Sequence, residues 1–223
     1  MALAQSLKIV LARPHKAGYP FIGGGAAVAV VGLLVGGWLF WPAFLFTLFA
    51  LYFFRDPDRV PPTTPGLVIA PADGHVVSIG MFPPPAELAM GDAPVWRVAI
   101  FLSVIDVHVN RSPVAGRVRK VVYHHGKFLS ANLDKASDEN ERNALAIELP
   151  DGRMIACVQI AGLVARRILC DANHGDTLQA GERFGIIRFG SRTDVYLPDG
   201  VRPTVLLGQT MIGGETVLAD LKG

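Results

Sequence analysis

The chain has 223 residues, a length that suits one compact domain or one domain with an appendage. Its 21 Lys and Arg residues against 19 Asp and Glu residues give a net charge of +2, which excludes a nucleic-acid binder that works through bulk positive charge. Charged residues make up only 18% of the chain and apolar residues 51%, whereas a typical soluble domain has roughly one quarter charged residues.

The apolar excess lies near the N-terminus, because no charged residue occurs between Lys16 and Arg55. Residues 21–54 read FIGGGAAVAVVGLLVGGWLFWPAFLFTLFALYFF, which is longer than the roughly 20 residues of one spanning helix. Trp41-Pro42 interrupts the run, since proline cannot donate its amide and disfavours helix in the residue before it. We predict an α-helical membrane hairpin or re-entrant anchor within residues 1–54, with segments at about 20–38 and 43–54. A single tilted, kinked span is the alternative.

The charges that flank this run predict its orientation. Lys8, Arg13 and Lys16 precede it, and Arg55 and Arg59 follow it. Cytoplasmic loops carry an excess of Lys and Arg, which places the N-terminus in the cytoplasm. A hairpin returns the rest of the chain to the same side. The predicted location is therefore the cytoplasmic membrane, with the remaining residues on its cytoplasmic side. The run is too long for a secretory signal peptide.

Residues 55–66 form a Pro-rich linker, and a different texture begins at Leu67. Short β-branched runs alternate with turn residues, as is typical of strands. These runs are 67–80, 95–103, 116–125, 145–162, 183–191, 193–200 and 202–209. Pro150-Asp151-Gly152 is a hairpin turn inside one of them. We predict that residues 67–223 form a mainly β domain, a sandwich or a partly closed barrel.

Common catalytic motifs are absent from the sequence: there is no GxSxG, HExxH, P-loop or GxGxxG after a strand. His124, His125 and His174 lack the neighbours that zinc sites use, so we predict no metal. Cys157 and Cys170 have no CxxC spacing, and we interpret both as small buried apolar residues.

Three local features remain, and each of them alone is ordinary. PADGH (71–75) puts an acid at a strand-end turn, DVHVNRSP (106–113) puts a His and an Arg at the end of an apolar strand, and FGSR (189–192) contains a Gly-Ser pair. A turn aspartate, a structural histidine and a chance dipeptide are the corresponding simple interpretations.

Taken in order behind an apolar anchor, these features resemble the phosphatidylserine decarboxylases, specifically their short prokaryotic form. The resemblance covers about residues 55 to 198. It rests on PADGHV (71–76), DVHVNRSP (106–113), FLSANLDKASDENERN (128–143), VQIAGLVARRI (158–168), GDTLQAGERFGIIRFGS (175–191) and the following VYLP.

The resemblance implies a self-processing enzyme. The Ser191 hydroxyl attacks the Gly190 carbonyl, and the chain is cut into a β chain (1–190) and an α chain (191–223) that stay together as a heterodimer. Ser191 becomes a pyruvoyl group, which forms a Schiff base with the substrate and takes up the electrons that decarboxylation leaves. No metal and no pyridoxal phosphate are implied. Phosphatidylserine becomes phosphatidylethanolamine and CO₂, so the implied partners are an anionic serine phospholipid and its membrane.

The Asp–His–Ser set of this family maps onto Asp73 and Ser191, but its histidine is ambiguous here. Longer relatives have the pattern HxxHxP, in which the second His acts in self-cleavage. The first His matches His108, and Arg111 occupies the second position. We assign His108 to both steps; the alternative is that His75 or His124 serves in cleavage.

Two further residues are candidates for substrate binding. Arg111 could hold the phosphate or carboxylate of the substrate with two hydrogen bonds, or it is a surface charge at the end of a strand. His75 is the second candidate. Residues 111–135 are also rich in Lys and Arg, which indicates either a solvated face or a basic surface against an anionic membrane.

Two other functions remain open from the residues alone. One is a non-catalytic, membrane-tethered β module that binds a partner. The other is a hydrolase that uses Ser191, His108 and Asp73 without cleaving itself.

Overall fold

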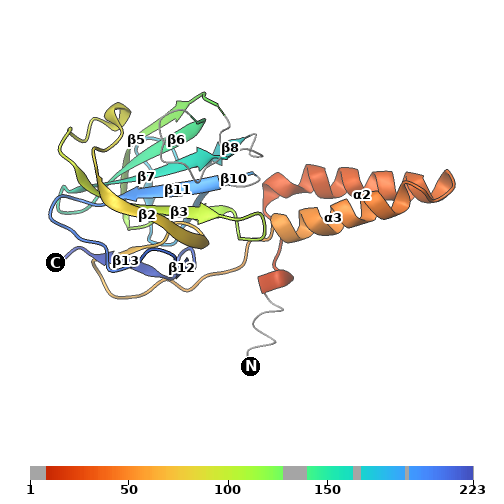
Figure 1. The fold of residues 1–223 in the computed structure, drawn as a ribbon, viewed down its shortest axis with the longest axis horizontal. Helices are drawn as coiled ribbons and strands as arrows, with labels where there is room; N and C mark the ends of the chain where they lie inside the picture. Colours follow the sequence, from red (N-terminus) through yellow and green to blue (C-terminus); the bar gives the residue numbers. More distant parts are fainter. Residues whose placement is uncertain (1–8, 128–139, 163–166, 189–190, 223) are drawn as a thin grey trace. The chain divides into compact units, whose positions relative to one another are not determined.

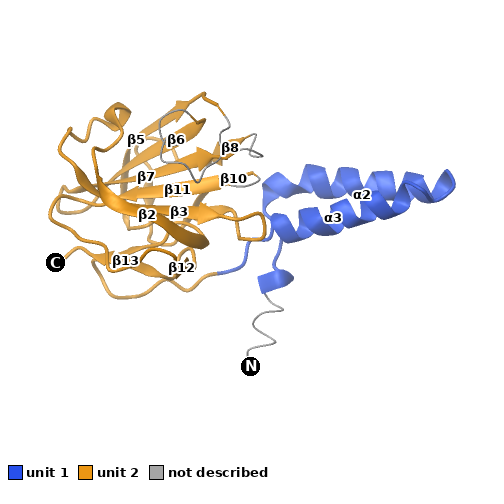
Figure 2. Ribbon diagram, viewed as in Figure 1, with its two compact units in different colours: residues 1–58 blue, residues 59–223 orange. Residues whose placement is uncertain are grey.

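The structure is a computed structural model that describes residues 9–127, 140–162, 167–188 and 191–222. An apolar helical segment precedes a β-rich segment (Figure 1). The chain divides into two compact units, Met1–Asp58 and Arg59–Gly223 (Figure 2). The mainly β fold with an N-terminal apolar helical anchor segment is thus confirmed.

The first unit is an antiparallel helical hairpin. It contains a short 3₁₀ helix, η1 (Lys16–Gly18), followed by α2 (Tyr19–Leu34) and α3 (Phe40–Phe53). The two ends of the hairpin meet, since the His15 amide donates to the Phe54 carbonyl over 2.7 Å and the Asp56 amide donates to the Arg13 carbonyl over 2.9 Å. A single kinked span, the alternative from the sequence, is therefore wrong.

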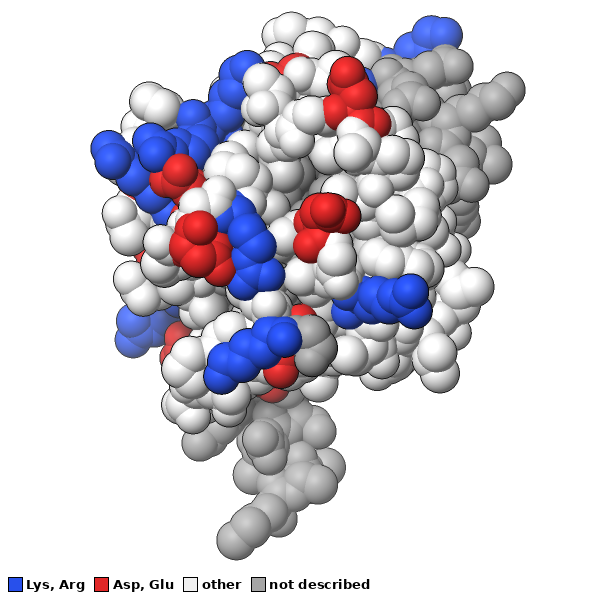
Figure 3. All heavy atoms as spheres, turned by 90° about the vertical axis from the view of Figure 1, so that its left-hand side faces the viewer, with Lys and Arg blue, Asp and Glu red and all other residues white. Residues whose placement is uncertain are grey.

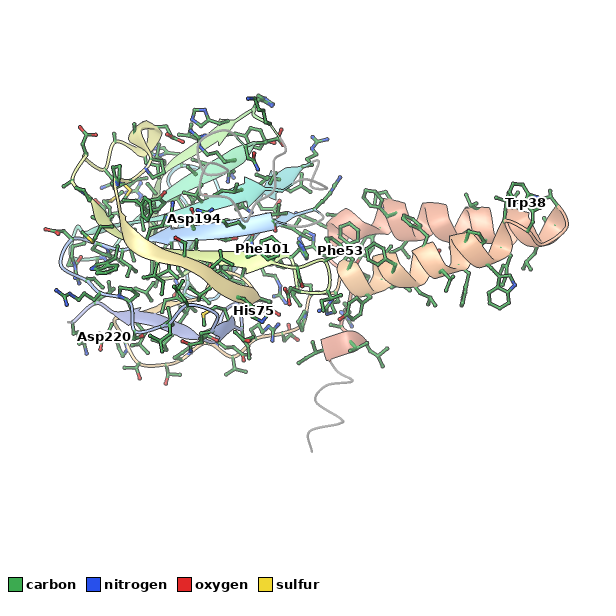
Figure 4. All side chains as sticks on the ribbon, viewed as in Figure 1. Trp38, Phe53, His75, Phe101, Asp194 and Asp220 are labelled. Atoms are coloured by element: carbon green, nitrogen blue, oxygen red, sulfur yellow. The ribbon has the colours of Figure 1, made fainter. Side chains whose placement is uncertain are left out.

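The position predicted for the break in the hairpin is also wrong. The chain turns at residues 35–39, where Gly36 and Gly37 have φ angles of 98° and 81°. Glycine adopts this left-handed region without the steric penalty of a side chain. Pro42 instead lies in the first turn of α3, where backbone amides have no partner within the helix and its missing N–H costs nothing. Figure 4 shows Trp38 at this turn.

Small residues bring the two helices close together. A Cβ atom at Gly25 would lie 2.5 Å from Thr47 Oγ1, and one at Gly32 would lie 2.6 Å from the Phe40 backbone nitrogen. The helical stretch Lys16–Leu34 has 19 residues and is apolar enough to cross a membrane by length and composition. It is about 28 Å long at 1.5 Å per residue, close to the roughly 30 Å of a hydrocarbon core. This helix is consistent with a membrane anchor.

The second unit is built from β-strands. Its elements are β1 (Leu67–Ile69), β2 (Gly74–Phe82), η2 (Ala86–Leu88), β3 (Val95–Leu102), β4 (Val109–Arg111), β5 (Gly116–His124), β6 (Arg142–Glu148), β7 (Met154–Ala161), β8 (Ile168–Cys170), β9 (Thr177–Leu178), β10 (Arg183–Ile187), β11 (Ser191–Tyr196), β12 (Thr210–Met211) and β13 (Val217–Asp220). A large sheet has the order β12-β2-β3-β11-β7-β6-β5-β9, and two small sheets have the orders β4-β10-β8 and β1-β13.

The large sheet has an inner and an outer face, because side chains alternate along each strand. Val195 of β11, Cys157 of β7 and Leu145 of β6 are cross-strand neighbours and belong to the main apolar core. Ser191 and Thr193 lie four and two residues before Val195 on the same strand, so their side chains are on the same inner face of the sheet. The predicted hairpin turn at residues 150–152 joins β6 to β7 and is confirmed.

Two strand predictions fail in detail. Residues 202–209 are not a strand: Gln209 N donates to the Leu206 carbonyl in a turn, and Gly208 has a φ of 79°. The DVHVNRSP segment does not end the preceding strand either. A turn at Ser103–Asp106 ends β3 at Leu102, and residues 109–111 begin the separate strand β4.

Candidate active site

Ser191 is the first residue of β11 and lies between two strands. It pairs with Leu102 of β3 on one side and with Ala161 of β7 on the other. The residue is fully buried. Its Oγ has no hydrogen-bond partner among the residues that the structure describes, which is rare for a buried hydroxyl. Gly190, its partner in the predicted cleaved bond, lies outside the described residues.

His108 is fully buried, and its backbone is hydrogen-bonded to the small sheet. Its carbonyl accepts a hydrogen bond from the Ile187 amide over 3.3 Å, which fixes His108 beside the end of β10. Ile187 packs in one apolar cluster with Ala161, and Ala161 is the cross-strand partner of Ser191. The His108 backbone and Ser191 thus both adjoin one small apolar cluster, which contains Ile187 and Ala161.

The His108 ring is oriented by its own loop. Its Nδ1 lies 2.9 Å from the Asp106 carbonyl oxygen. Because a carbonyl can only accept, Nδ1 carries the proton, and in the neutral ring Nε2 is the basic nitrogen. The loop is itself held, since the Asp106 carboxylate accepts hydrogen bonds from the Ser103 amide and hydroxyl, both at 2.7 Å.

Asp73 lies in the turn before β2 with 18% of its side chain exposed. Its Oδ2 accepts a hydrogen bond from Arg59 Nη2 over 2.7 Å, and its Oδ1 accepts one from the Gly213 amide over 2.8 Å. Sequence analysis missed Arg59 as a partner, because it lies in the linker and reads there only as a flanking charge.

The Asp73 turn is adjacent to β3, which pairs with the strand of Ser191, and to β4, which begins directly after His108. The Pro71 carbonyl accepts a hydrogen bond from the Arg111 amide of β4 over 2.8 Å. Gly74 has a φ of 143°, and a Cβ atom there would lie 2.1 Å from the Phe101 carbonyl of β3. Only glycine permits this approach. The turn thus stands beside β3 and β4, which lead to Leu102 and His108.

Arg111 points into the protein and is only 4% exposed. Its Nη1 donates to the Gly181 carbonyl over 3.0 Å, and its Cδ lies against the backbone of Gly214. The alternative that Arg111 is a surface charge at a strand end is therefore excluded. Its role in substrate binding stays a prediction.

The two alternative histidines lie on the outer face. His75 is exposed and pairs with Phe101, both of which Figure 4 labels. Phe101 in turn pairs with Arg192, the neighbour of Ser191 on the opposite face. His124 lies 3.3 Å from Glu87, to which its ring nitrogen points. The structure does not bring His75 or His124 together with Ser191.

A buried ion pair follows Ser191 on the outer face of β11. Arg192 donates from Nε and Nη2 to the two carboxylate oxygens of Asp194 over 2.6 Å and 2.7 Å. Arg97 Nη1 lies 3.8 Å from the same carboxylate, which Figure 4 shows in the middle of the sheet. These contacts fix the strand directly after Ser191.

Other groups that could carry chemistry are less suitable. Burial raises the pKa of the Cys157 thiol, and also that of Cys170, which disfavours a reactive thiolate. Among the described residues, no group of three or more His, Cys, Asp or Glu could hold a metal ion. The buried serine remains as the candidate nucleophile.

The structure describes only part of the segment for which a basic surface was predicted, residues 111–135. Within residues 111–127, Arg111 is buried and Arg119 forms an ion pair with Glu148 at 2.7 Å. The face drawn in Figure 3 mixes basic and acidic side chains. Residues 128–135 lie outside the described part of the chain, as do the first twelve residues of the 128–143 motif.

The fold and the site together define a class of protein. In this class an apolar helical hairpin is followed in the sequence by a β domain, and a buried serine begins a strand that is paired on both sides. The family model described as phosphatidylserine decarboxylase matches residues 46–219. The chain therefore belongs to the phosphatidylserine decarboxylase family of enzymes, and the resemblance seen in its motifs is confirmed.

Named relatives match over almost their whole length. A phosphatidylserine decarboxylase proenzyme of Granulibacter bethesdensis is 66% identical over 99% of this chain and 91% of its own. Proenzymes of the same name from Gluconacetobacter diazotrophicus and Gluconobacter oxydans are 63% and 58% identical, over 99% of this chain and 100% of their own.

Proposed function

We propose that this protein cuts its own backbone between Gly190 and Ser191 and then decarboxylates phosphatidylserine to phosphatidylethanolamine. The observation that carries the proposal is the Ser191 hydroxyl, which is fully buried and unpartnered among the described residues. The word proenzyme in the names of its relatives supports a chain that is processed. Both parts of the proposal rest on the same serine.

Self-cleavage begins when His108 Nε2 takes the proton of Ser191 Oγ. The oxygen attacks the Gly190 carbonyl carbon, the C–N bond breaks, and the released nitrogen takes the proton, which leaves an ester. Loss of the Ser191 α-proton and cleavage of its Cβ–Oγ bond then release residues 1–190 with a carboxylate end. Water hydrolyses the remaining dehydroalanine to a pyruvoyl group and ammonia.

The residues around Ser191 suit the group that it would become. The pyruvoyl group supplies the electron sink that decarboxylation needs and that ordinary side chains lack. The pairing of residue 191 with Leu102 and Ala161 would hold it in the sheet, and the Arg192–Asp194 ion pair would fix the strand behind it. His108 would return a proton to the substrate α-carbon, and the burial of residue 191 would limit the access of bulk water.

The apolar hairpin supports attachment of the enzyme to the membrane, which contains its lipid substrate. Hydrogen bonds join His15 to Phe54 and Arg13 to Asp56. The chain therefore enters and leaves the hairpin on the same side of the membrane. The Lys and Arg residues that flank it favour the cytoplasmic side. We place the enzyme on the cytoplasmic face of the cytoplasmic membrane, with the heterodimer of its own two chains as the mature form.

Carboxyl-labelled phosphatidylserine in detergent micelles tests the proposal. Wild-type protein should release labelled CO₂, and the Ser191→Ala variant should release none. A hydrolase would instead release free serine or fatty acid without CO₂, and a non-catalytic module would change nothing. Either of these results would overturn the proposed function.

A further inference from the structure

A row of polar side chains crosses the apolar interior next to Ser191. Thr193 of β11, Gln159 of β7 and Asn143 of β6 are consecutive cross-strand neighbours on the inner face. All three are buried, although Thr, Gln and Asn are mostly exposed in proteins. Sequence analysis missed this row, because its members come from three separate segments.

The row continues onto the small sheet that faces it. Asn143 Nδ2 donates to Gln159 Oε1 over 2.9 Å, and Gln159 Nε2 donates to Asn110 Oδ1 over 2.7 Å. Each amide thus fixes the orientation of the next one. The chain of hydrogen bonds ends on Asn110 of β4, two residues after His108, and leaves Asn110 Nδ2 as its terminal donor.

Two atoms of this polar row have no partner among the described residues: Asn110 Nδ2 and Thr193 Oγ1. Both residues are fully buried. The two side chains belong to opposite walls of the interior and are linked through Gln159. An amide nitrogen can only donate and a threonine hydroxyl can donate, so together they offer two donors to an acceptor group.

We propose that Asn110 Nδ2 and Thr193 Oγ1 bind the carboxylate of the substrate, with Gln159 and Asn143 as positioning residues. The inference rests on the proposed function, which attaches the substrate at residue 191. Thr193 lies two residues further along β11, about 6.6 Å at the usual strand rise, and the carboxylate of a serine headgroup can bridge that separation.

The neutral character of these donors suits decarboxylation. Negative charge leaves the carboxylate as the C–C bond breaks, so a cation at this place would stabilise the ground state more than the transition state. Amide and hydroxyl donors orient the group with weaker electrostatic attraction. Arg111, the charged residue nearest in sequence to Asn110, instead donates to the Gly181 carbonyl.

The test compares Thr193→Val and Asn110→Asp with wild type, using phosphatidylserine as substrate and phosphatidylethanolamine, which lacks the carboxylate, as competing ligand. Each variant should self-cleave normally. Losing one hydrogen bond to a charged group in Thr193→Val should raise the KM for phosphatidylserine about 10- to 100-fold, with kcat and the inhibition constant of phosphatidylethanolamine unchanged. Asn110→Asp also sets a carboxylate against the substrate carboxylate, so its KM for phosphatidylserine should rise at least as much. Thr193→Val should also keep its thermal stability, since it removes a hydroxyl without a partner.

Thr204→Val is the matched control, because the Thr204 hydroxyl donates to the carbonyl of Leu218 in β13 and lies outside the polar row. It should leave the KM unchanged. An equal weakening of both lipids, or a loss of self-cleavage in Thr193→Val, overturns this inference alone. A wild-type protein that releases no CO₂ overturns the proposed function itself.

Discussion

The Asp194 carboxylate is the central group of a fully buried cluster of charges. It accepts two hydrogen bonds from Arg192, at 2.6 Å and 2.7 Å, and lies 3.8 Å from Arg97. Asp194 and Arg192 are fully buried, and Arg97 is nearly so. Asp194→Asn keeps the shape of the side chain but removes its charge. Two buried guanidinium groups then lose the negative charge of this carboxylate.

Breaking a buried ion pair by removing one partner costs about 3–5 kcal/mol. We therefore expect Asp194→Asn to lower the free energy of unfolding by that amount. Urea unfolding in detergent micelles measures it, with Trp96 as the fluorescent probe after Trp38 and Trp41 are replaced by Phe. Trp96 lies on β3, which pairs with β11.

Glu148→Gln provides the matched control. Glu148 accepts the same pair of hydrogen bonds from Arg119, at 2.8 Å and 2.9 Å, but at the surface, where water and salt screen the charges. Glu148→Gln should lower the free energy of unfolding far less than Asp194→Asn does. Equal effects of the two variants would show that burial of the Arg192 pair does not determine its contribution.

Three further predictions concern other parts of the chain. Gly32→Ala should disrupt the helical hairpin, because a Cβ atom there meets the backbone at Phe40, whereas a Cβ atom at Gly24 meets nothing within 4 Å and Gly24→Ala should not; protease resistance in micelles compares them. Cys157, whose thiol pKa burial raises, should react with iodoacetamide at pH 8 only after unfolding; peptide mapping separates it from the partly exposed Cys170, and rapid labelling of Cys157 in the folded protein would contradict this. Burial, and then the charge of Asp194, raises the pKa of Tyr196 from 10.0 to about 12. The folded state therefore holds this proton more tightly, and its contribution to stability is present below pH 10 and lost as the pH rises through about 12; Tyr196→Phe should flatten that decline in urea unfolding, and an unchanged slope would refute the assignment.

Local sequence patterns were sufficient to predict the apolar helical hairpin and most strands. An uncharged apolar run predicts membrane helices from composition alone, and the hairpin followed from the length of that run. The turn was misplaced because Pro42 was weighted more than Gly36 and Gly37. A proline is tolerated in the first turn of a helix, so the paired glycines were the better indicator.

The candidate site could be proposed only from the order of the family motifs. A Gly-Ser pair carries no local pattern that reveals the burial of Ser191, and His108 was placed at the wrong end of a strand. The burial of the other site residues depends on packing between segments that are distant in sequence. Arg111 is buried because Gly181 and Gly214, both distant in sequence, approach it. The same holds for Asn110, which meets Gln159 from another sheet.

The most direct test of the whole proposal is the intact mass of the purified full-length protein. We expect two chains, residues 1–190 and residues 191–223, with the smaller chain blocked at its N-terminus, and a single uncut chain from Ser191→Ala. A wild-type protein that remains one full-length species on incubation, with N-terminal sequence only from Met1, would contradict the conversion of Ser191.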